Sequence, residues 1–376
     1  MKYGFPTTPD FDTQRSRFLA AAHAAGASVT TYDHPLKGPK GEALATDIAW
    51  LGSAGARRVL VALSGTHGVE GYYGSTCQTE WLHELAETPL PDDVAILFIH
   101  LINPHGTAWV RRVNEDNVDL NRNYVDFARA LPQNPHYEPL HAIYTARDID
   151  GHERRRADAL LAEAIAGSSW SAVNAIVGAG QYAHQDGLYF GGQQATWSNH
   201  TLREIVERFV APAQAAIVFD LHTGAGPFGH PMLMTIAQTP YPALDDAKNL
   251  FGAWLYTLVT RPDAPVSDTG VVARATGYTS QMLIDSVPHR SLMPLVIECG
   301  TYPEAQMHTA LRDDHWLFLY GDPRDARGRE ITHRLFESFM PADADWRALA
   351  WFRTRQIWTR ALAALPVLPA LRASGP

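Results

Sequence analysis

A short motif near the start of the chain carries two side chains that could bind a metal ion. The apolar run at residues 58–63 is followed by Ser-Gly-Thr-His-Gly-Val-Glu-Gly, in which His67 and Glu70 stand three positions apart. Imidazole nitrogen and carboxylate oxygen are both ligands of Zn²⁺. The interspersed glycines allow a tight turn on which both side chains can face one point. Taken alone the pair is a weak signal, because the same spacing also occurs without a metal.

A third ligand of the same chemistry stands far along the chain. A second apolar run ends at Asp220, and His222 follows it. A catalytic zinc site needs a third protein ligand and an open position, so His222 would complete the set from a different strand. Asp220 is either a carboxylate that orients the site or one that caps the next turn.

A carboxylate ends a third apolar run. Glu298 closes the sequence Leu-Val-Ile-Glu at residues 295–298. Metal-assisted hydrolysis needs a base that takes a proton from water and returns it to the leaving amine. Burial at a strand end raises the pKa of a carboxyl group toward that task. Three apolar runs that each end in His or Glu indicate a site far more strongly than any one of them.

An arginine-rich segment, residues 103–124, lies between these motifs and holds Arg111, Arg112 and Arg122. Arginine binds carboxylates through two parallel hydrogen bonds and stabilises a developing oxyanion. The segment therefore favours a substrate that carries a carboxylate. A loop whose arginines pair with its own aspartates explains it equally well.

In these motifs the chain resembles the zinc carboxypeptidase family. The family's marks stand in the family's order across residues 55–305, as His67-Gly-Val-Glu70, Asp119-Leu-Asn121-Arg122-Asn123, His222 and Glu298. The arginine-rich segment is most similar to an intracellular branch of that superfamily. It is also similar to the deacylases that cleave aspartate or succinyl-glutamate amides.

The resemblance implies a metal centre and a reaction. His67, Glu70 and His222 would bind one Zn²⁺, and Glu298 would activate the water. The leading hypothesis is a metallocarboxypeptidase that releases a C-terminal residue. The alternatives are an N-acyl-amino-acid amidohydrolase with the same site, and a non-catalytic binding protein on the same scaffold.

The resemblance also implies substrate contacts. Asn121 and Arg122 would hold the terminal carboxylate of the substrate, and Arg112, with Arg111 as the alternative, would polarise the scissile carbonyl. Tyr278 matches a tyrosine that the family carries on a mobile loop, although a tyrosine packed on the surface fits the same position. Asp285 falls in the region that shapes the family's side-chain pocket, where an acid favours a basic side chain. Residues 181–199, rich in Gly, Gln and aromatics, either line the pocket or form a structural loop.

The elements that must position these residues alternate along the chain. Buried strands are predicted at residues 58–63, 94–99, 215–219, 232–236 and 295–297. Helices are predicted between them at residues 75–87, 158–166, 201–210 and 243–260. This alternation predicts an α/β fold, a three-layer α/β/α sandwich with a mixed, largely parallel central sheet. The resemblance makes it zinc exopeptidase-like, and in such sheets ligands bind beyond the carboxyl ends of the strands.

One domain over residues 1–376 is expected, because no linker or repeat divides the chain. A helix and a hairpin at about residues 10–50, with a turn at 38–41, and a C-terminal helix at about 345–365 should pack on it.

Composition excludes several other classes of protein. The net charge is −9 and there is no basic stripe, which argues against nucleic-acid binding. Two distant cysteines are no disulfide framework. We see no signal peptide and no apolar run long enough for a membrane span, so a cytoplasmic protein without a membrane partner is expected. The expected partner is a small peptide or acylated amino acid with a free carboxylate.

Overall fold

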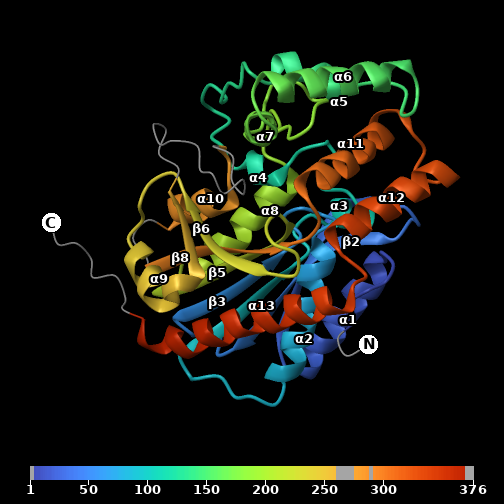
Figure 1. Cartoon of the computed structure of the whole chain (residues 1–376). Coiled ribbons are helices and arrows are strands. Elements are labelled where there is room, and N and C mark those ends of the chain that lie inside the picture. Colours follow the sequence, from blue (N-terminus) through green and yellow to red (C-terminus); the bar gives the residue numbers. More distant parts are fainter. Residues whose placement is uncertain (1–3, 260–274, 288–290, 369–376) are drawn as a thin grey trace.

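The computed structural model describes residues 4–259, 275–287 and 291–368. Its strands form one mixed sheet in the order β1-β2-β4-β3-β5-β8-β6-β7 (Figure 1). The strands are β1 (Ser28–Lys37), β2 (Ala43–Gly52), β3 (Arg58–Ser64), β4 (Val94–His100), β5 (Ala215–Gly224), β6 (Pro231–Ala237), β7 (Leu255–Val259) and β8 (Ser291–Gly300). The four central strands β4, β3, β5 and β8 are parallel, whereas β1, β2 and β6 pair with antiparallel neighbours. The predicted fold class is confirmed.

Helices cover both faces of this sheet. They are α1 (Phe11–Ala24), α2 (Gly71–Leu85), α3 (Pro104–Ala108), α4 (Leu120–Asn123), α5 (His141–Tyr144), α6 (His152–Gly167), α7 (Trp170–Gly178), α8 (Trp197–Ile205), α9 (Leu244–Phe251), α10 (Thr279–Ser286), α11 (Glu304–Tyr320), α12 (Ala326–Phe339) and α13 (Ala344–Ala364). The N-terminal helix and hairpin and the C-terminal helix form where the sequence predicts them.

Alternation along the central strands supplies two apolar cores. In β3, Leu60 and Ala62 pack with α1, α2, α9, α12 and α13. Val59, Val61 and Leu63 point the other way, toward α8 and α10. Successive side chains of a strand face opposite sides, so a run that is apolar throughout must be covered twice. This burial holds the carboxyl ends of the central strands in a fixed register.

One predicted helix is wrong in its second half. The helix expected at residues 243–260 ends at Phe251, and Gly252 follows with φ +57°. A left-handed glycine of this kind stops a helix. After a 3-10 turn at Gly252–Trp254, the residues Leu255–Val259 are rich in β-formers and become β7, which pairs with β6 at the sheet edge. Residue 260 lies outside the described residues.

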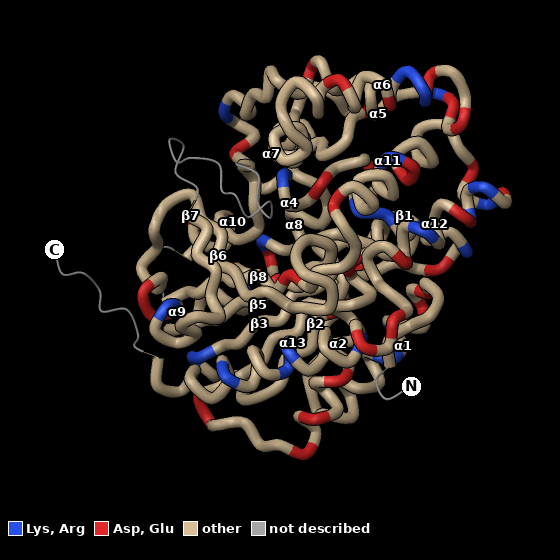
Figure 2. The backbone as a smooth tube through the Cα atoms, in the orientation of Figure 1, with Lys and Arg blue, Asp and Glu red and all other residues tan. Residues whose placement is uncertain are grey.

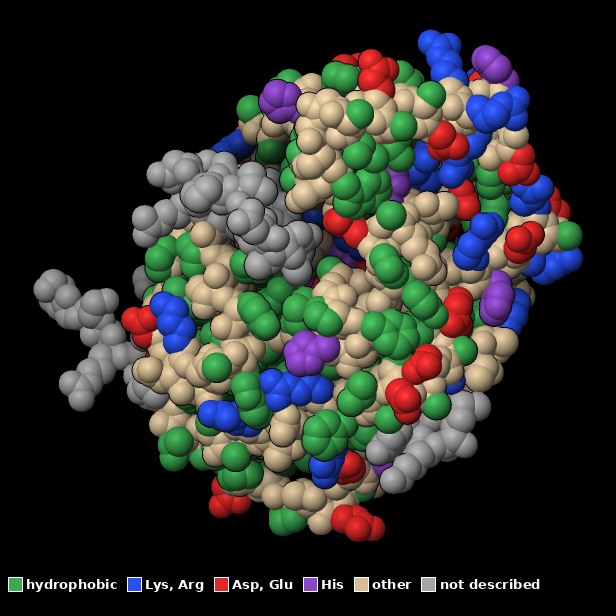
Figure 3. Space-filling model, viewed as in Figure 1, with side chains coloured by type: hydrophobic (Ala, Val, Ile, Leu, Met, Phe, Trp, Pro, Cys, Tyr) green, Lys and Arg blue, Asp and Glu red, His purple; other side chains and the backbone are tan. Residues whose placement is uncertain are grey.

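A helical unit that the sequence pattern did not delimit lies beside the sheet. Helices α5, α6 and α7 enclose a small apolar core of their own, which includes Tyr137, Ile143 and Val173. In Figure 1 this unit lies at the top, above α4 and α8, and Figure 3 shows the surface hollowed beneath it. It therefore stands over the part of the molecule where the central strands end.

Charged positions lie mainly on helices and loops around the sheet, with acidic and basic residues interspersed (Figure 2). Within the described residues no single helix is long and apolar enough to cross a membrane. The helices His152–Gly167 and Trp170–Gly178 reach that length and composition only together, across a bend of 112°.

His100, the last residue of β4, makes stability depend on pH. Its ring stacks on Phe18 at 4.1 Å between centroids, and its Nε2 lies 2.8 Å from the Ser75 hydroxyl. Burial lowers the pKa of His100 to about 3, against 6.5 for a free histidine. Below about pH 6.5, His100 is therefore protonated in the unfolded chain but stays neutral in the folded chain.

The free energy of unfolding should consequently fall as the pH drops from 6.5 toward 3, by up to about 1.4 kcal/mol per pH unit from this residue. A His100→Gln variant can still reach Ser75 but does not titrate. We expect it to be less stable at pH 7.5 and to lose less stability on acidification, measured by urea unfolding at pH 7.5, 6.0 and 5.0. An unchanged pH dependence in the variant would exclude His100 as the source.

Candidate active site

Three of the sequence-predicted residues meet where β3 and β5 end. His67 and Glu70 lie on the turn between β3 and α2, and His222 lies near the end of β5. All three side chains are buried, and one ligand atom of each lies within 4.8 Å of the others. The sequence pattern predicted that the strand before His222 ends at Asp220. In the structure this strand, β5, continues to Gly224, so His222 is held within the sheet.

The turn that carries His67 is tight and can form only with glycine at two of its positions. Gly65 has φ +76°, and a Cβ atom on Gly68 would lie 2.1 Å from the carbonyl carbon of Gly106. The Gly68 N–H donates to the carbonyl of Arg112 at 3.1 Å. Close contact between these backbones fixes the arginine-rich segment against the ligand turn.

A carboxylate lies close to one ring nitrogen of each of the two histidines. Asp119 Oδ1 lies 3.5 Å from His67 Nδ1, and Asp220 Oδ2 lies 3.0 Å from His222 Nε2. Asp220 is in turn fixed by the Thr66 hydroxyl, which donates to its Oδ1 at 2.8 Å. Metal-binding histidines commonly have such a carboxylate on the nitrogen that faces away from the ion. The donor set, two imidazoles and a carboxylate, fits Zn²⁺.

Arg112 bridges this cluster from the cavity side. Its Nε lies 3.1 Å from Asp119 Oδ2, its Nη1 3.2 Å from Glu70 Oε1 and its Nη2 2.7 Å from His67 Nε2. Burial, together with the positive charge of Arg112, holds the pKa of His67 well below its usual value. His67 is therefore neutral, which is the form that binds a metal ion.

Glu70 and His222 are joined directly. His222 Nδ1 lies 3.1 Å from Glu70 Oε2, which also accepts the Thr223 N–H at 3.0 Å. Burial opposes a charge on His222, but the carboxylates of Asp220 and Glu70 outweigh it and raise the pKa of His222 well above its usual value. The local field therefore favours a positive charge at this point, whether a proton or a metal ion.

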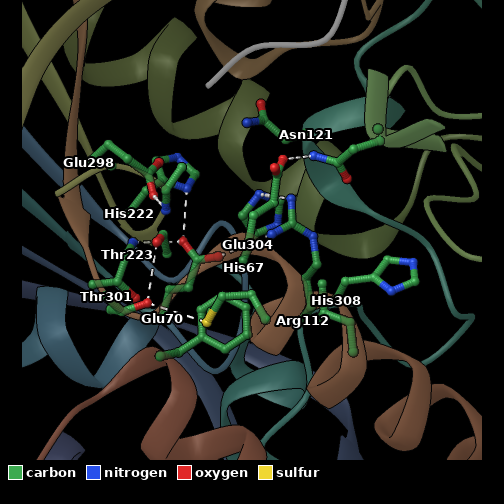
Figure 4. Close-up of a pocket in the computed structure, with 18 of the residues that line it drawn as sticks. His67, Glu70, Arg112, Asn121, His222, Thr223, Glu298, Thr301, Glu304 and His308 are labelled. Carbon is green, nitrogen blue, oxygen red and sulfur yellow. Dashed lines mark hydrogen bonds and ion pairs between the residues drawn. The ribbon is translucent and has the colours of Figure 1, made fainter. Parts of the chain in front are cut away.

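Glu298 faces the same cluster from β8. In the parallel pairing of β5 with β8 it stands opposite His222, and its Oε1 accepts the Ala225 N–H at 2.9 Å. Figure 4 shows Glu298, His222 and Glu70 directed toward one another. Burial, and next the negative charge of Glu70, raise the pKa of Glu298 to about 7. A carboxyl group with this pKa can accept and release a proton near neutral pH.

Three predicted substrate residues line the same cavity: Asn121, Arg122 and Tyr278. Arg122 donates to the carbonyl of Gly178 through Nη2 at 2.6 Å, and its guanidinium lies 5.0 Å from the ring centre of Tyr278. Asn121 Oδ1 accepts the Thr279 N–H at 2.9 Å. Tyr278 directly precedes α10 and is buried, rather than exposed on the surface.

The structure places two other predicted residues outside the cavity. Arg111 is buried away from it, with Nε 3.4 Å from Asp314 Oδ2, so of the two neighbouring arginines only Arg112 reaches the site. Asp285 is exposed on α10 and accepts a hydrogen bond from Gln281 at 2.8 Å. The helix turns Asp285 toward solvent, so it does not shape the pocket as the sequence suggested.

The cavity has a volume of about 590 Å³ and includes residues that sequence reasoning missed. Tyr189 has φ +54°, and its ring centre lies 5.1 Å from the guanidinium of Arg112 and 5.8 Å from that of Arg122. It belongs to the Gly- and Gln-rich segment at residues 181–199, whose composition was the available signal. Helix α7 and the start of α11, with Glu304, form another wall, which no motif marked.

Comparison with known proteins gives one family and several structures. The sequence model of the family described as "Protein of unknown function (DUF2817)" matches residues 8–353. No curated protein sequence matches the chain.

Several solved structures are similar to this chain. Carboxypeptidase A from Helicoverpa armigera is 12% identical over 92% of this chain and 74% of that one, with a TM-score of 0.45. Bovine thrombin-activatable fibrinolysis inhibitor is 10% identical over 95% and 98%, with a TM-score of 0.41. A candidate succinylglutamate desuccinylase/aspartoacylase family protein from Shewanella amazonensis SB2B is 18% identical over 78% and 71%, with a TM-score of 0.35.

Removal of either histidine should abolish tight metal binding. We expect the wild-type protein to retain about one Zn²⁺ per chain after dialysis against a weak chelator, and His67→Ala and His222→Ala to retain none, because each loses one of three protein ligands. Mass spectrometry of metal content measures this. His200→Ala, an exposed histidine on α8, is the matched control and should keep the ion. Zinc retained by both ligand variants would refute the site.

Proposed function

The chain belongs to the family described as protein of unknown function DUF2817, and we propose that it is a zinc-dependent hydrolase of amide bonds. Within that class we propose a metallocarboxypeptidase that releases a C-terminal residue from short peptides. The observation that carries the proposal is the convergence of His67, Glu70 and His222 with Glu298 on one cavity wall. Holding the carboxylate of Glu298 near the buried carboxylate of Glu70 costs stability unless a cation compensates them, and a metal ion is such a cation.

The catalytic base would be Glu298. His67, Glu70 and His222 would hold a Zn²⁺ ion, which would supply a water molecule of lowered pKa and a polarised substrate carbonyl. Glu298 takes the proton from the attacking water as its oxygen bonds to the carbonyl carbon. It then delivers that proton to the amide nitrogen as the C–N bond breaks. Its pKa of about 7 suits both steps.

Arg112 would stabilise the charge that develops on the carbonyl oxygen. Asp119 holds its Nε at 3.1 Å, which leaves both Nη groups directed at the cluster of His67 and Glu70. A metal ion at His67 Nε2 would displace the Nη2 contact, while the contact of Nε with Asp119 would keep the guanidinium beside the cluster.

The terminal carboxylate of the substrate would bind at Arg122 and Asn121, beside Tyr278. Backbone carbonyls accept three of the N–H groups of Arg122, and these contacts fix its position. The positive charge remains, because a carbonyl does not neutralise it.

The side chain of the released residue would meet an apolar surface. Met234 and Ile236 of β6 and Val296 of β8 line the cavity and pack together. We therefore propose an apolar residue at the C-terminus of the substrate, in place of the basic residue that Asp285 would have favoured.

An N-acyl-amino-acid amidohydrolase would use the same base, metal ligands and carboxylate contacts. A panel of peptides with a free C-terminus and of small acylated amino acids separates the two activities. Turnover of the acylated amino acids alone would favour the amidohydrolase. A zinc-loaded protein that binds both but cleaves neither would be a binding protein.

Replacement of the base should remove catalysis and leave the metal. We expect Glu298→Gln to lower kcat by about 10²- to 10⁴-fold, the usual contribution of general acid–base catalysis, with zinc content unchanged. Steady-state kinetics with parallel metal analysis measures both. Asp285→Asn, an exposed acid outside the cavity, is the control and should keep wild-type kcat. A fully active Glu298→Gln protein would exclude Glu298 as the base.

Arg122→Lys should raise KM for substrates with a free carboxylate by about tenfold and change kcat less. Lysine keeps the positive charge but cannot form the two parallel hydrogen bonds that arginine makes to a carboxylate. The same change should have no effect on C-terminally amidated peptides. Arg111→Lys, in the buried arginine outside the cavity, should alter stability rather than KM. An equal KM for both substrate types in wild-type protein would disprove the carboxylate contact.

A further inference from the structure

The cavity extends from the metal ligands to a wall formed by α7 and the start of α11. Ser171 and Asn174 line it from α7, and Glu304 and His308 line it from α11. Figure 4 labels Glu304 and His308 among the side chains around the pocket. Glu304 is the first residue of α11 and is exposed at this wall.

Uncharged groups hold the carboxylate of Glu304 in place. The indole Nε1 of Trp170 donates to Oε2 at 2.7 Å, and the amide of Asn174 donates to Oε1. None of the ion pairs between described residues involves Glu304. A carboxylate offers about four acceptor positions, so these two contacts leave others open. The side chain is thus fixed while its negative charge is available.

Aromatic residues also line the cavity, and Tyr302 stands two positions before Glu304 in the chain. Tyr302 and Phe228 both line it, with 5.6 Å between their ring centroids, and Trp170 contacts Glu304 directly. Aromatic faces attract cations, and a neighbouring carboxylate adds to that attraction.

His308 adds no positive charge to the wall. Its Nε2 lies 3.1 Å from the Tyr144 hydroxyl, and burial, assisted by Arg312 and Arg154, lowers the pKa of His308 to about 3. At neutral pH this wall therefore has a net negative charge.

Helix α7 contacts both Glu304 and Arg122, at positions separated along its axis. Arg122 binds the carbonyl of Gly178 at the C-terminal end of α7, whereas Glu304 binds Asn174 and Trp170, one and two turns earlier. At about 1.5 Å per residue this is about 6 to 12 Å along the helix. An extended di- or tripeptide spans about 7 to 10 Å.

The wall is also rigid. Arg312 of α11 donates to the carbonyl of Ile143 at 3.1 Å, and Trp316 donates to that of Arg147 at 2.7 Å. These contacts fix α11 against the helical unit, so the spacing between the two charges is set before a substrate arrives.

We propose that Glu304 and the aromatic residues beside it form a subsite for an ammonium group. The substrate is then a di- or tripeptide with a free amino group, rather than an N-acylated amino acid. Its carboxylate lies at Arg122 and its ammonium group at Glu304, so that both ends are recognised by opposite charge. This inference rests on the proposed hydrolase, because it names the substrate class of the same cavity.

The test compares two peptides of equal length with an apolar C-terminal residue, one with a free amino group and one N-acetylated. We expect the wild-type protein to prefer the free amine in kcat/KM. Glu304→Gln, which keeps the shape of the side chain, should lower kcat/KM for the free amine by about tenfold through KM and leave the acetylated peptide unchanged. Glu330→Gln, an exposed acid on α12, should change neither. Equal effects of Glu304→Gln on both peptides, or none on either, would overturn the subsite.

Binding separates failure of this inference from failure of the proposed function. In the Glu298→Gln background, calorimetry measures Kd for both peptides without cleavage. A tenfold weaker Kd for the free amine after Glu304→Gln supports the ammonium subsite even if the wild-type protein hydrolyses nothing. Cleavage of both peptides with no influence of Glu304 on kinetics or Kd overturns the subsite and leaves the hydrolase in place.

Discussion

The repulsion between the buried carboxylate of Glu70 and the partly buried carboxylate of Glu298 is the constraint on which the rest of the site depends. Each is desolvated, and the charge of Glu70 contributes to the raised pKa of Glu298. Arg112 lies 3.2 Å from Glu70 and offsets part of this cost, and the carboxylates of Asp220 and Glu70 raise the pKa of His222 beside them. In the proposed account, the negative charge that would attract a metal ion also raises the pKa of the carboxyl group proposed as the base.

Much of the fold could be predicted because the central strands are apolar throughout. Such runs identify a sheet covered on both faces, and a His or Glu at the end of each run indicates the edge where a site would form. The register of β5 with β8 then brings His222 and Glu298 together. β7 could not be predicted in this way, because its short apolar run continues the helical pattern of α9 and only the three-residue turn Gly252–Trp254 separates them.

The substrate side of the cavity was much less predictable. Arg111 and Arg112 are adjacent in sequence, and only the backbone contact between Gly68 and Arg112 and the ion pair of Arg111 with Asp314 decide which one faces the cavity. Glu304 carries no local signal, because its role depends on how α7 packs against α11. Tertiary packing of this kind leaves no periodicity or spacing in the sequence. The motifs therefore predict the candidate metal ligands, whereas the α7 wall of the cavity could be found only from the structure.

The most direct test of the central claim is X-ray absorption at the zinc edge of the purified, zinc-loaded protein. The account predicts two imidazole nitrogens and at least one carboxylate oxygen at about 2.0–2.2 Å, with no sulfur ligand. A shell of oxygen atoms alone, or sulfur at about 2.3 Å, would show that the ion is bound elsewhere and would contradict the site at His67, Glu70 and His222.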